Sequence, residues 1–293
     1  MRDEYPDKVI DTLAYQFTRP PPKVTKPRRN VIVRLCDIEC CFAHPLGALA
    51  DIDRRNADFA RDLRRWGEVA ERLYVWDYVV NFAHSIMPFP NLYTLRANIA
   101  FFADHHVKGV YEEAAYFTPG AEFAELRTWI IAKSLWDPGH DTDRAIDEFL
   151  DGFYEEAAGP VRRYIDLIHG KARMDGIHFT ISEGPSSPLF SQDVLARSAA
   201  LFDEAEKRVA RKPAALHRVR VARLPVLYVQ IARLREEMRK PEGRTAADIR
   251  RLQTLFERFD AVARKEGVTH VGEQRSYPRW AEEVKSLLSP RGK

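Results

Sequence analysis

Two adjacent glutamates end the short apolar run "VKGVYEEAAY", residues 107 to 116. Glu112 and Glu113 follow Tyr111 and lie close to Tyr116. Carboxyl groups in such a place can donate or accept a proton, attack as nucleophiles, or accept hydrogen bonds from hydroxyl groups. Because side chains alternate across a strand, we expect at most one glutamate to face a ligand. The other is then expected to cap the next helix or pair with an arginine.

Similar residues follow three earlier apolar runs, at 9 to 15, 30 to 36 and 72 to 80. In parallel α/β proteins, ligands meet the carboxyl ends of the strands, where the loops gather. The residues at the four predicted strand ends are Tyr15, Gln16, Asp37, Glu39, His44, Asp77, Asn81, His84, Glu112, Glu113 and Tyr116.

This set of carboxylates and aromatic side chains suits a sugar, because aromatic faces stack on pyranose C–H surfaces while carboxylates bind hydroxyl groups. It also suits glycosidic cleavage, which needs a protonated carboxyl group and a second charge beside an oxocarbenium-like centre. We predict Glu112, Glu113 and Asp77 as catalytic residues. We predict Trp76, Tyr78, Asn81, His84, Tyr116, Tyr15, Glu39 and His44 as substrate-binding residues.

Each of these residues also has a purely structural interpretation. Asp77 lies inside a predicted strand, where a charge is costly unless it is paired, for example with Arg34 or Arg96. His44 and His84 can equally be structural histidines with satisfied hydrogen bonds. The aromatic stripe at positions 74, 76 and 78 is more often part of a core than a sugar platform.

The three cysteines, Cys36, Cys40 and Cys41, are too close together and odd in number for a disulfide framework. Their spacing does not match a zinc knuckle, because no second Cys or His pair follows at a usual interval. We interpret them as small buried residues and predict no metal and no cofactor. A thiol enzyme using Cys36 or Cys40 with His44 is the minor alternative.

Strands and helices alternate in the first half of the chain. Helical periods occupy "NADFARDLRRW", "NLYTLRANIAFFADHH" and "EFAELRTWIIAKSLW", between and after the four strand-like runs. This alternation predicts four consecutive parallel strands with crossover helices on the outer side.

From about residue 142 onward, every strong period is helical. Thr245 and Asp248 form a capping box, and Pro225 is expected to bend its helix. The loop 175 to 191 carries Gly184, Pro185 and Pro188 and is the best boundary. We therefore predict an α/β region at 1–175 and a helical region at 176–293.

Size and composition limit the function classes. The chain has 293 residues, 45% of them hydrophobic, and a formal charge of only +3 with both signs dispersed. This balance predicts no nucleic-acid partner, and no apolar run reaches membrane-spanning length. No signal-peptide pattern follows Met1, so the chain as given is expected to be cytoplasmic; an upstream signal-bearing half would place it in the periplasm or outside the cell.

Five blocks in the same order resemble a known family: "YPDKVIDTLAY", "NVIVRLCDIECCFAHPL", "LYVWDYVVNFAH", "PFPNLYTLRANIAFFADHHVKGVYEEAAY" and "ELRTWIIAKSLWDP". They resemble the bacterial glycoside-hydrolase-like domain of unknown function 4838. That family includes endo-β-N-acetylglucosaminidases of glycoside hydrolase family 163 and is distantly similar to family 20 hexosaminidases. The resemblance is close over residues 5 to 175 and looser in the helical tail.

The resemblance implies the C-terminal half of a (β/α)8 TIM-type barrel, followed by an all-helical region. It implies activity on N-acetylglucosamine-containing glycans, with Asp77 and Glu112 or Glu113 facing the sugar. The acid of the similar hexosaminidases follows the fourth barrel strand, which would lie upstream of this chain. A non-catalytic carbohydrate-binding remnant is therefore the alternative, and another chain is a possible partner that completes the barrel.

Overall fold

The computed structural model describes residues 4–47, 53–240 and 244–288. Four strands, β1 (Ile10–Ala14), β2 (Val31–Cys36), β3 (Leu73–Tyr78) and β4 (Val107–Glu113), form one sheet in the order of the sequence. All three neighbouring pairs are parallel, which confirms the prediction of four consecutive parallel strands. The sheet is open: within the described ranges β1 and β4 are its edges, and no closed barrel forms.

The two faces of this sheet differ in burial. Val33 and Leu35 of β2 and Leu73 and Val75 of β3 are almost fully buried. They belong to the same apolar cluster as residues of the crossover helices. Burying each such side chain stabilises the fold by roughly 2 kcal/mol.

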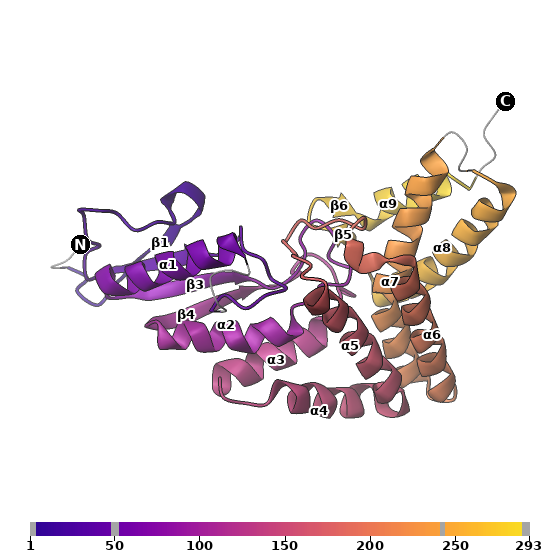
Figure 1. Cartoon of the computed structure of the whole chain (residues 1–293), viewed down its shortest axis with the longest axis horizontal. Coiled ribbons are helices and arrows are strands. Elements are labelled where there is room, and N and C mark those ends of the chain that lie inside the picture. Colours follow the sequence, from indigo (N-terminus) through magenta and orange to yellow (C-terminus); the bar gives the residue numbers. More distant parts are fainter. Residues whose placement is uncertain (1–3, 48–52, 241–243, 289–293) are drawn as a thin grey trace.

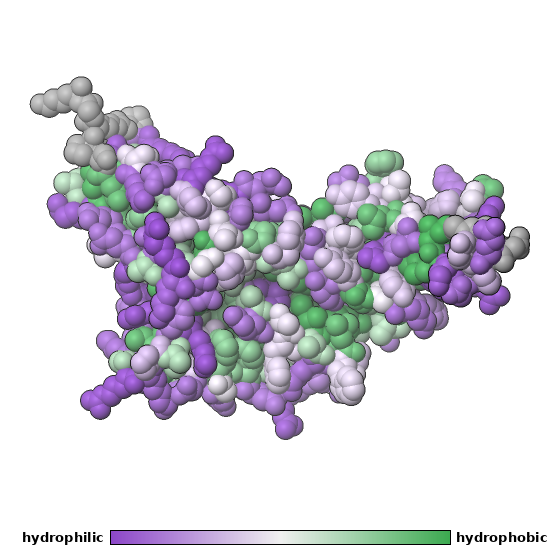
Figure 2. Space-filling model, turned by 180° about the vertical axis from the view of Figure 1, so that it is seen from behind, coloured by the Kyte–Doolittle hydropathy of each residue, from purple (hydrophilic) through white to green (hydrophobic). Residues whose placement is uncertain are grey.

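On the opposite face, Arg34, Tyr74 and Trp76 are only half-buried and Tyr111 is 45% exposed. We call this face, made of Arg34, Tyr74, Trp76, Tyr111 and Glu113, the open face. Figure 2 shows hydrophobic residues reaching the surface among hydrophilic ones in the half of the molecule that holds the sheet.

Three helices accompany the sheet: α1 (Arg54–Val69), α2 (Leu92–Asp104) and α3 (Ala124–Trp136) (Figure 1). Helix α1 begins where the Asp53 side chain accepts a hydrogen bond from the Arg55 amide. Its apolar positions Phe59, Leu63 and Trp66 recur at helical spacing and are buried, as the sequence predicts. Helix and strand periods therefore located the α/β region within a few residues.

The second half of the chain is mainly helical, as predicted. Its helices are α4 (Thr142–Tyr154), α5 (Ala158–Met174), α6 (Gln192–Arg208), α7 (Pro213–Arg239), α8 (Ala246–Glu266) and α9 (Tyr277–Lys285). The capping box of Thr245 and Asp248 at the start of α8 is confirmed, and Pro225 lies inside α7. A small antiparallel hairpin, β5 (His270–Gly272) with β6 (Arg275–Ser276), is an addition that the sequence analysis did not predict.

The segment after α5 returns to the carboxyl end of the sheet before the helices continue. The Phe42 amide donates to the Phe179 carbonyl (2.8 Å), and the Phe82 amide donates to the Ile181 carbonyl (2.8 Å). The loop 175 to 191, predicted as a boundary, thus packs on the loops that follow β2 and β3. Helices α6, α7 and α8 lie at the end of the molecule opposite the N-terminus (Figure 1).

Candidate functional site

Three acidic residues stand side by side at the carboxyl end of the sheet. Strand pairing places Asp77 of β3 opposite Glu112 of β4. Cys36 pairs with Trp76, so the residues that follow them, Asp37 and Asp77, also stand side by side. The Tyr78 amide donates to Oδ1 of Asp37 (3.2 Å). We call Asp37, Asp77 and Glu112 the acid row. It lies on the buried face of the sheet, because its members are two residues from Leu35, Val75 and Val110.

The acid row is shielded from water, and not all three of its carboxyl groups are ionised together. Oδ2 of Asp37, both oxygens of Asp77 and both oxygens of Glu112 are buried, and as carboxylates they find no donor among the described residues. Asp77 lies between Asp37 on one side and Glu112 on the other, so a hydrogen bond between two of these carboxyl groups needs a proton on one partner.

Burial is the main cause of the shifted pKa values in the acid row. It raises the pKa of Asp37 and Glu112 well above the ordinary value, and the nearby Asp77 raises both further. Burial also raises the pKa of Asp77 to about 6, while hydrogen bonds from its two neighbours oppose the rise. As the pH rises, Asp77 therefore loses its proton first, while Asp37 and Glu112 stay protonated and can donate hydrogen bonds to it.

Glu113 lies on the other side of the sheet, on the open face. Its Oε2 accepts a hydrogen bond from the indole Nε1 of Trp76 (2.8 Å). The Trp76 ring contacts Tyr111 edge-on at 4.6 Å between centroids, and the Arg34 guanidinium lies 6.0 Å from it. Partial burial raises the pKa of Glu113, and the Trp76 bond opposes this. As predicted, the two adjacent glutamates point to opposite faces, although neither pairs with an arginine in the part of the chain that the structure describes.

The β5–β6 hairpin brings one more carboxylate to this end of the sheet. Glu273 accepts a hydrogen bond from the hydroxyl of Tyr116 (2.8 Å), and its amide donates to the Phe82 carbonyl (2.7 Å). Gly272 permits this approach, since a Cβ there would lie 2.2 Å from the Ala83 carbonyl oxygen. Glu273 was missed because its two-residue turn carries no period that links it to the sheet.

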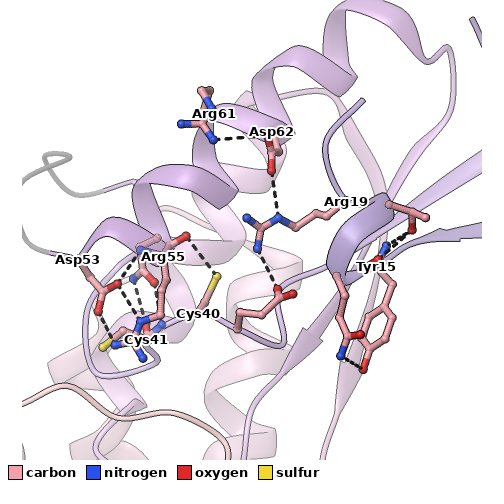
Figure 3. A network of polar contacts seen from close by, with 12 residues as sticks. Tyr15, Arg19, Cys40, Cys41, Asp53, Arg55, Arg61 and Asp62 are labelled. Carbon is pink, nitrogen blue, oxygen red and sulfur yellow. Dashed lines mark hydrogen bonds and ion pairs between the residues drawn. The ribbon is translucent and has the colours of Figure 1, made fainter. Parts of the chain in front are cut away.

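Tyr15 and Glu39 lie beside the first two strands. Tyr15 precedes a short 3-10 helix and its hydroxyl accepts from Gln16 Nε2 (3.1 Å). Glu39 pairs with Arg19 (2.8 Å), which also binds the buried Asp62 of α1 (3.0 Å). Figure 3 shows Arg19 between Asp62 and the carboxylate below it. These contacts join the loops after β1 and β2 to α1.

Asn81 and His84 point toward other parts of the molecule. Asn81 is buried and donates to the Glu183 carbonyl (2.8 Å), while its Oδ1 accepts from the His84 amide (2.9 Å). Nδ1 of His84 contacts the hydroxyl of Tyr228 in α7 (2.7 Å). Burial lowers the pKa of His84 to about 4, so it is neutral at pH 7. Both residues tie the loop after β3 to the helical half.

Burial of the three cysteines is confirmed, and all three are free thiols. His44 meets one of them, because its Nδ1 lies 3.2 Å from Sγ of Cys41. The His178 ring, from the segment after α5, lies 4.8 Å from the His44 ring between centroids. Burial lowers the pKa of His44, and the nearby His178 lowers it further. This cluster lies in the loop after β2.

Together these features define an α/β protein with an open parallel sheet whose carboxyl end gathers carboxylates and aromatic side chains. The chain belongs to the family described as Domain of unknown function (DUF4838), which matches residues 1–166. That match spans all four parallel strands and ends within α5. No curated protein and no solved structure matches the chain. In the part of the chain that the structure describes, no helix is long and apolar enough to cross a membrane.

Proposed function

We propose that this chain is a carbohydrate-active domain, a glycoside hydrolase domain that acts on N-acetylglucosamine-containing glycans. The observation that carries the proposal is the Trp76–Glu113 pair on the open face. It combines an aromatic ring, a carboxylate of raised pKa and the neighbouring Tyr111 at the carboxyl end of a parallel sheet. Stacking on a sugar ring and a hydrogen bond to its hydroxyl or glycosidic oxygen need these groups together.

Within this proposal the three predicted catalytic residues take different roles. Glu113 reaches the sugar as acid or hydroxyl ligand. Asp77 and Glu112 lie behind the strand with every carboxyl oxygen buried, so they support the loops and set the local charge. Glu273 binds Tyr116 and lies close enough to Glu113 to raise its pKa, and in this proposal it takes part in holding the sugar.

We also propose that the open sheet is half of a (β/α)8 barrel. In that arrangement the open face lines the barrel interior, and the edges β1 and β4 pair with strands from an upstream segment or another chain. The half-buried residues of the open face support this, because aromatic and charged groups on an inner face fit a ligand cavity.

A non-catalytic carbohydrate-binding role is the second candidate. It is favoured by the burial of Asp77 and Glu112, which leaves Glu113 as the one predicted catalytic residue that faces a ligand. A hydrolase needs a second charge or the substrate's own N-acetyl group beside the acid.

Turnover and affinity, measured together, decide between the two candidates. The wild-type chain is assayed with an aryl N-acetylglucosaminide and with a complex N-acetylglucosamine-containing glycan, and binding of the same compounds is measured by calorimetry. The hydrolase proposal expects turnover that Glu113→Gln lowers by about 100-fold or more in kcat/KM. Binding without turnover would select the second candidate. The absence of both binding and turnover would reject both candidates.

Glu148→Gln is the matched control. Glu148 lies in α4 with a half-exposed side chain that pairs with Lys133. An exposed pair contributes little to stability, so this variant is expected to keep wild-type activity. Equal loss in both variants would show that the assay reports folding rather than the site.

A further inference from the structure

Three potential metal ligands from distant parts of the sequence converge beside α1. A thiol sulfur and two imidazole nitrogens, from Cys41, His44 and His178, all lie within 4.8 Å of one another. Around a tetrahedral zinc ion with bonds of about 2.0 to 2.3 Å, ligand atoms lie roughly 3.5 Å apart. Cys41 and His44 already have 3.2 Å between Sγ and Nδ1. A small rotation of the side chains would complete the geometry.

The first two ligands form a chelating turn, Cys41–Phe42–Ala43–His44, that is rigidly held. Asn56 of α1 accepts from the Cys41 amide (2.8 Å) and donates to the carbonyls of Cys41 (2.9 Å) and His44 (3.0 Å). Asn56 is itself buried. The amide of Phe179 points at the Cys41 sulfur (3.5 Å), as amides do toward metal-bound thiolates.

The third ligand is oriented by a carboxylate. Nδ1 of His178 lies 2.8 Å from Oδ2 of Asp53, which leaves Nε2 free to bind. Asp53 is fixed in turn by the amide and guanidinium of Arg55 (2.6 to 3.0 Å). Figure 3 shows Asp53 and Arg55 beside Cys41 at the start of α1. A carboxylate that binds the far nitrogen of a ligating histidine is a recurrent feature of metal sites.

We propose that Cys41, His44 and His178 bind one divalent cation of the zinc class. One thiolate and two imidazoles are the ligands that such borderline-soft cations prefer. On binding, the Cys41 thiol releases its proton to solvent as the metal–sulfur bond forms. The His178 side chain is 40% exposed, so the ion has a path of entry and a water completes the fourth position.

The cation would join the loop after β2 to the segment that begins the helical half. Its ligands come from both sides of the predicted boundary at residues 175 to 176, and the Phe42 to Phe179 backbone bond lies beside it. The inference is independent of the proposed function, because none of these residues belongs to the open face.

Metal binding to the whole chain tests the inference directly. The protein is stripped with a chelator, dialysed and titrated with Co²⁺ and with Zn²⁺ alone. We expect one ion per chain, near-ultraviolet thiolate-to-cobalt absorption that Zn²⁺ abolishes, and a rise in melting temperature with Zn²⁺. His178→Gln and Cys41→Ser should each weaken binding by about 100-fold or more, and Asp53→Asn by about 10- to 100-fold.

Cys40→Ser is the matched control, since Cys40 is the adjacent, fully buried cysteine and lies outside the cluster. It should keep metal affinity and the cobalt absorption. The inference is overturned if the wild-type chain binds neither ion at micromolar concentration, or if binding survives in Cys41→Ser and His178→Gln. If Cys41→Ser does not fold, His178→Gln decides alone, because its half-exposed side chain is not part of the core.

Discussion

Asp77 has two acidic neighbours, Asp37 and Glu112, and not the basic partner that its purely structural interpretation predicted. The alternative pairing with Arg34 or Arg96 is wrong, because Arg34 binds Asp11 and Arg96 binds the Pro138 carbonyl. A residue's place on a strand follows from its position in the apolar run, so the carboxyl-end location of Asp77 was predictable. Its partners were not, because they depend on the register between strands, which the sequence of one strand does not encode.

The buried acid row predicts an unusual dependence of stability on pH. The pKa of Asp77 is raised to about 6 in the folded chain, so the folded state holds this proton more tightly than the unfolded state. The stability that comes from the Asp77 proton is therefore complete below about pH 4 and is lost as the pH rises through about 6. Asp37 and Glu112, whose pKa values are also raised, add to the loss as the pH rises.

Asp77→Asn should remove the part of this loss that comes from Asp77. At about pH 8 we expect the unfolding free energy of the variant to exceed that of the wild type by about 1 to 3 kcal/mol, and its melting temperature to be higher. At about pH 5 both differences should be smaller. Thermal unfolding at the two pH values measures both. Asp151→Asn, at an exposed position in α4, is the control and should follow the wild type. A pH profile unchanged in Asp77→Asn would contradict a shared proton in the row.

At the scale of elements, the number of residues in a strand or helix largely decided whether it could be predicted. Strands of five to seven residues and helices of thirteen or more show their periods clearly, and all four parallel strands were located from them. The β5–β6 hairpin has strands of three and two residues, too short for a period to be recognised. Length alone did not suffice, because helix α5 has 17 residues and was not singled out, although its region was predicted to be helical.

The hairpin approaches the backbone of Ala83 closely at Gly272, which gives a prediction for this element. In Gly272→Ala, the new methyl group would lie against the backbone of Ala83 rather than a movable side chain. We expect a loss of about 1 to 3 kcal/mol in unfolding free energy and displacement of Glu273 from Tyr116. Denaturant unfolding gives the first quantity.

Gly170→Ala in α5 provides the comparison for that variant. A Cβ at Gly170 meets nothing within 4 Å, so alanine there should stabilise its helix by up to about 1 kcal/mol. If both alanine variants behave alike, the hairpin is not docked as described.

At the scale of the molecule, the sheet has an incompletely covered face and two unpaired edges within the described ranges. Several large hydrophobic side chains are exposed around it: Tyr5, Val9, Ile10, Leu13, Phe17, Val24, Tyr111 and Tyr116. Unpaired strand edges with exposed apolar side chains favour association. The prediction that such a chain pairs with another chain or is poorly soluble therefore stands as a prediction.

Light scattering tests this prediction through the edge strand β1. We expect the wild-type chain to associate with increasing concentration, and Leu13→Lys to reduce association, because a charge on an edge strand opposes strand pairing. Leu13 is 48% exposed, and the control Leu135→Lys changes a side chain of α3 that is 50% exposed. A monodisperse, heat-stable wild-type monomer would show that the edges need no partner.

The most direct test of a sugar site on the open face is the affinity of one tryptophan variant. Calorimetric titration with an N-acetylglucosamine-containing oligosaccharide compares the wild type with Trp76→Ala and with Trp136→Ala, whose tryptophan is 92% exposed at the end of α3. We predict that Trp76→Ala weakens binding at least about 10-fold, the loss of about 1.4 kcal/mol or more of ring contact, while Trp136→Ala binds as the wild type does. Unchanged affinity in Trp76→Ala, or equal weakening in both variants, would contradict the site.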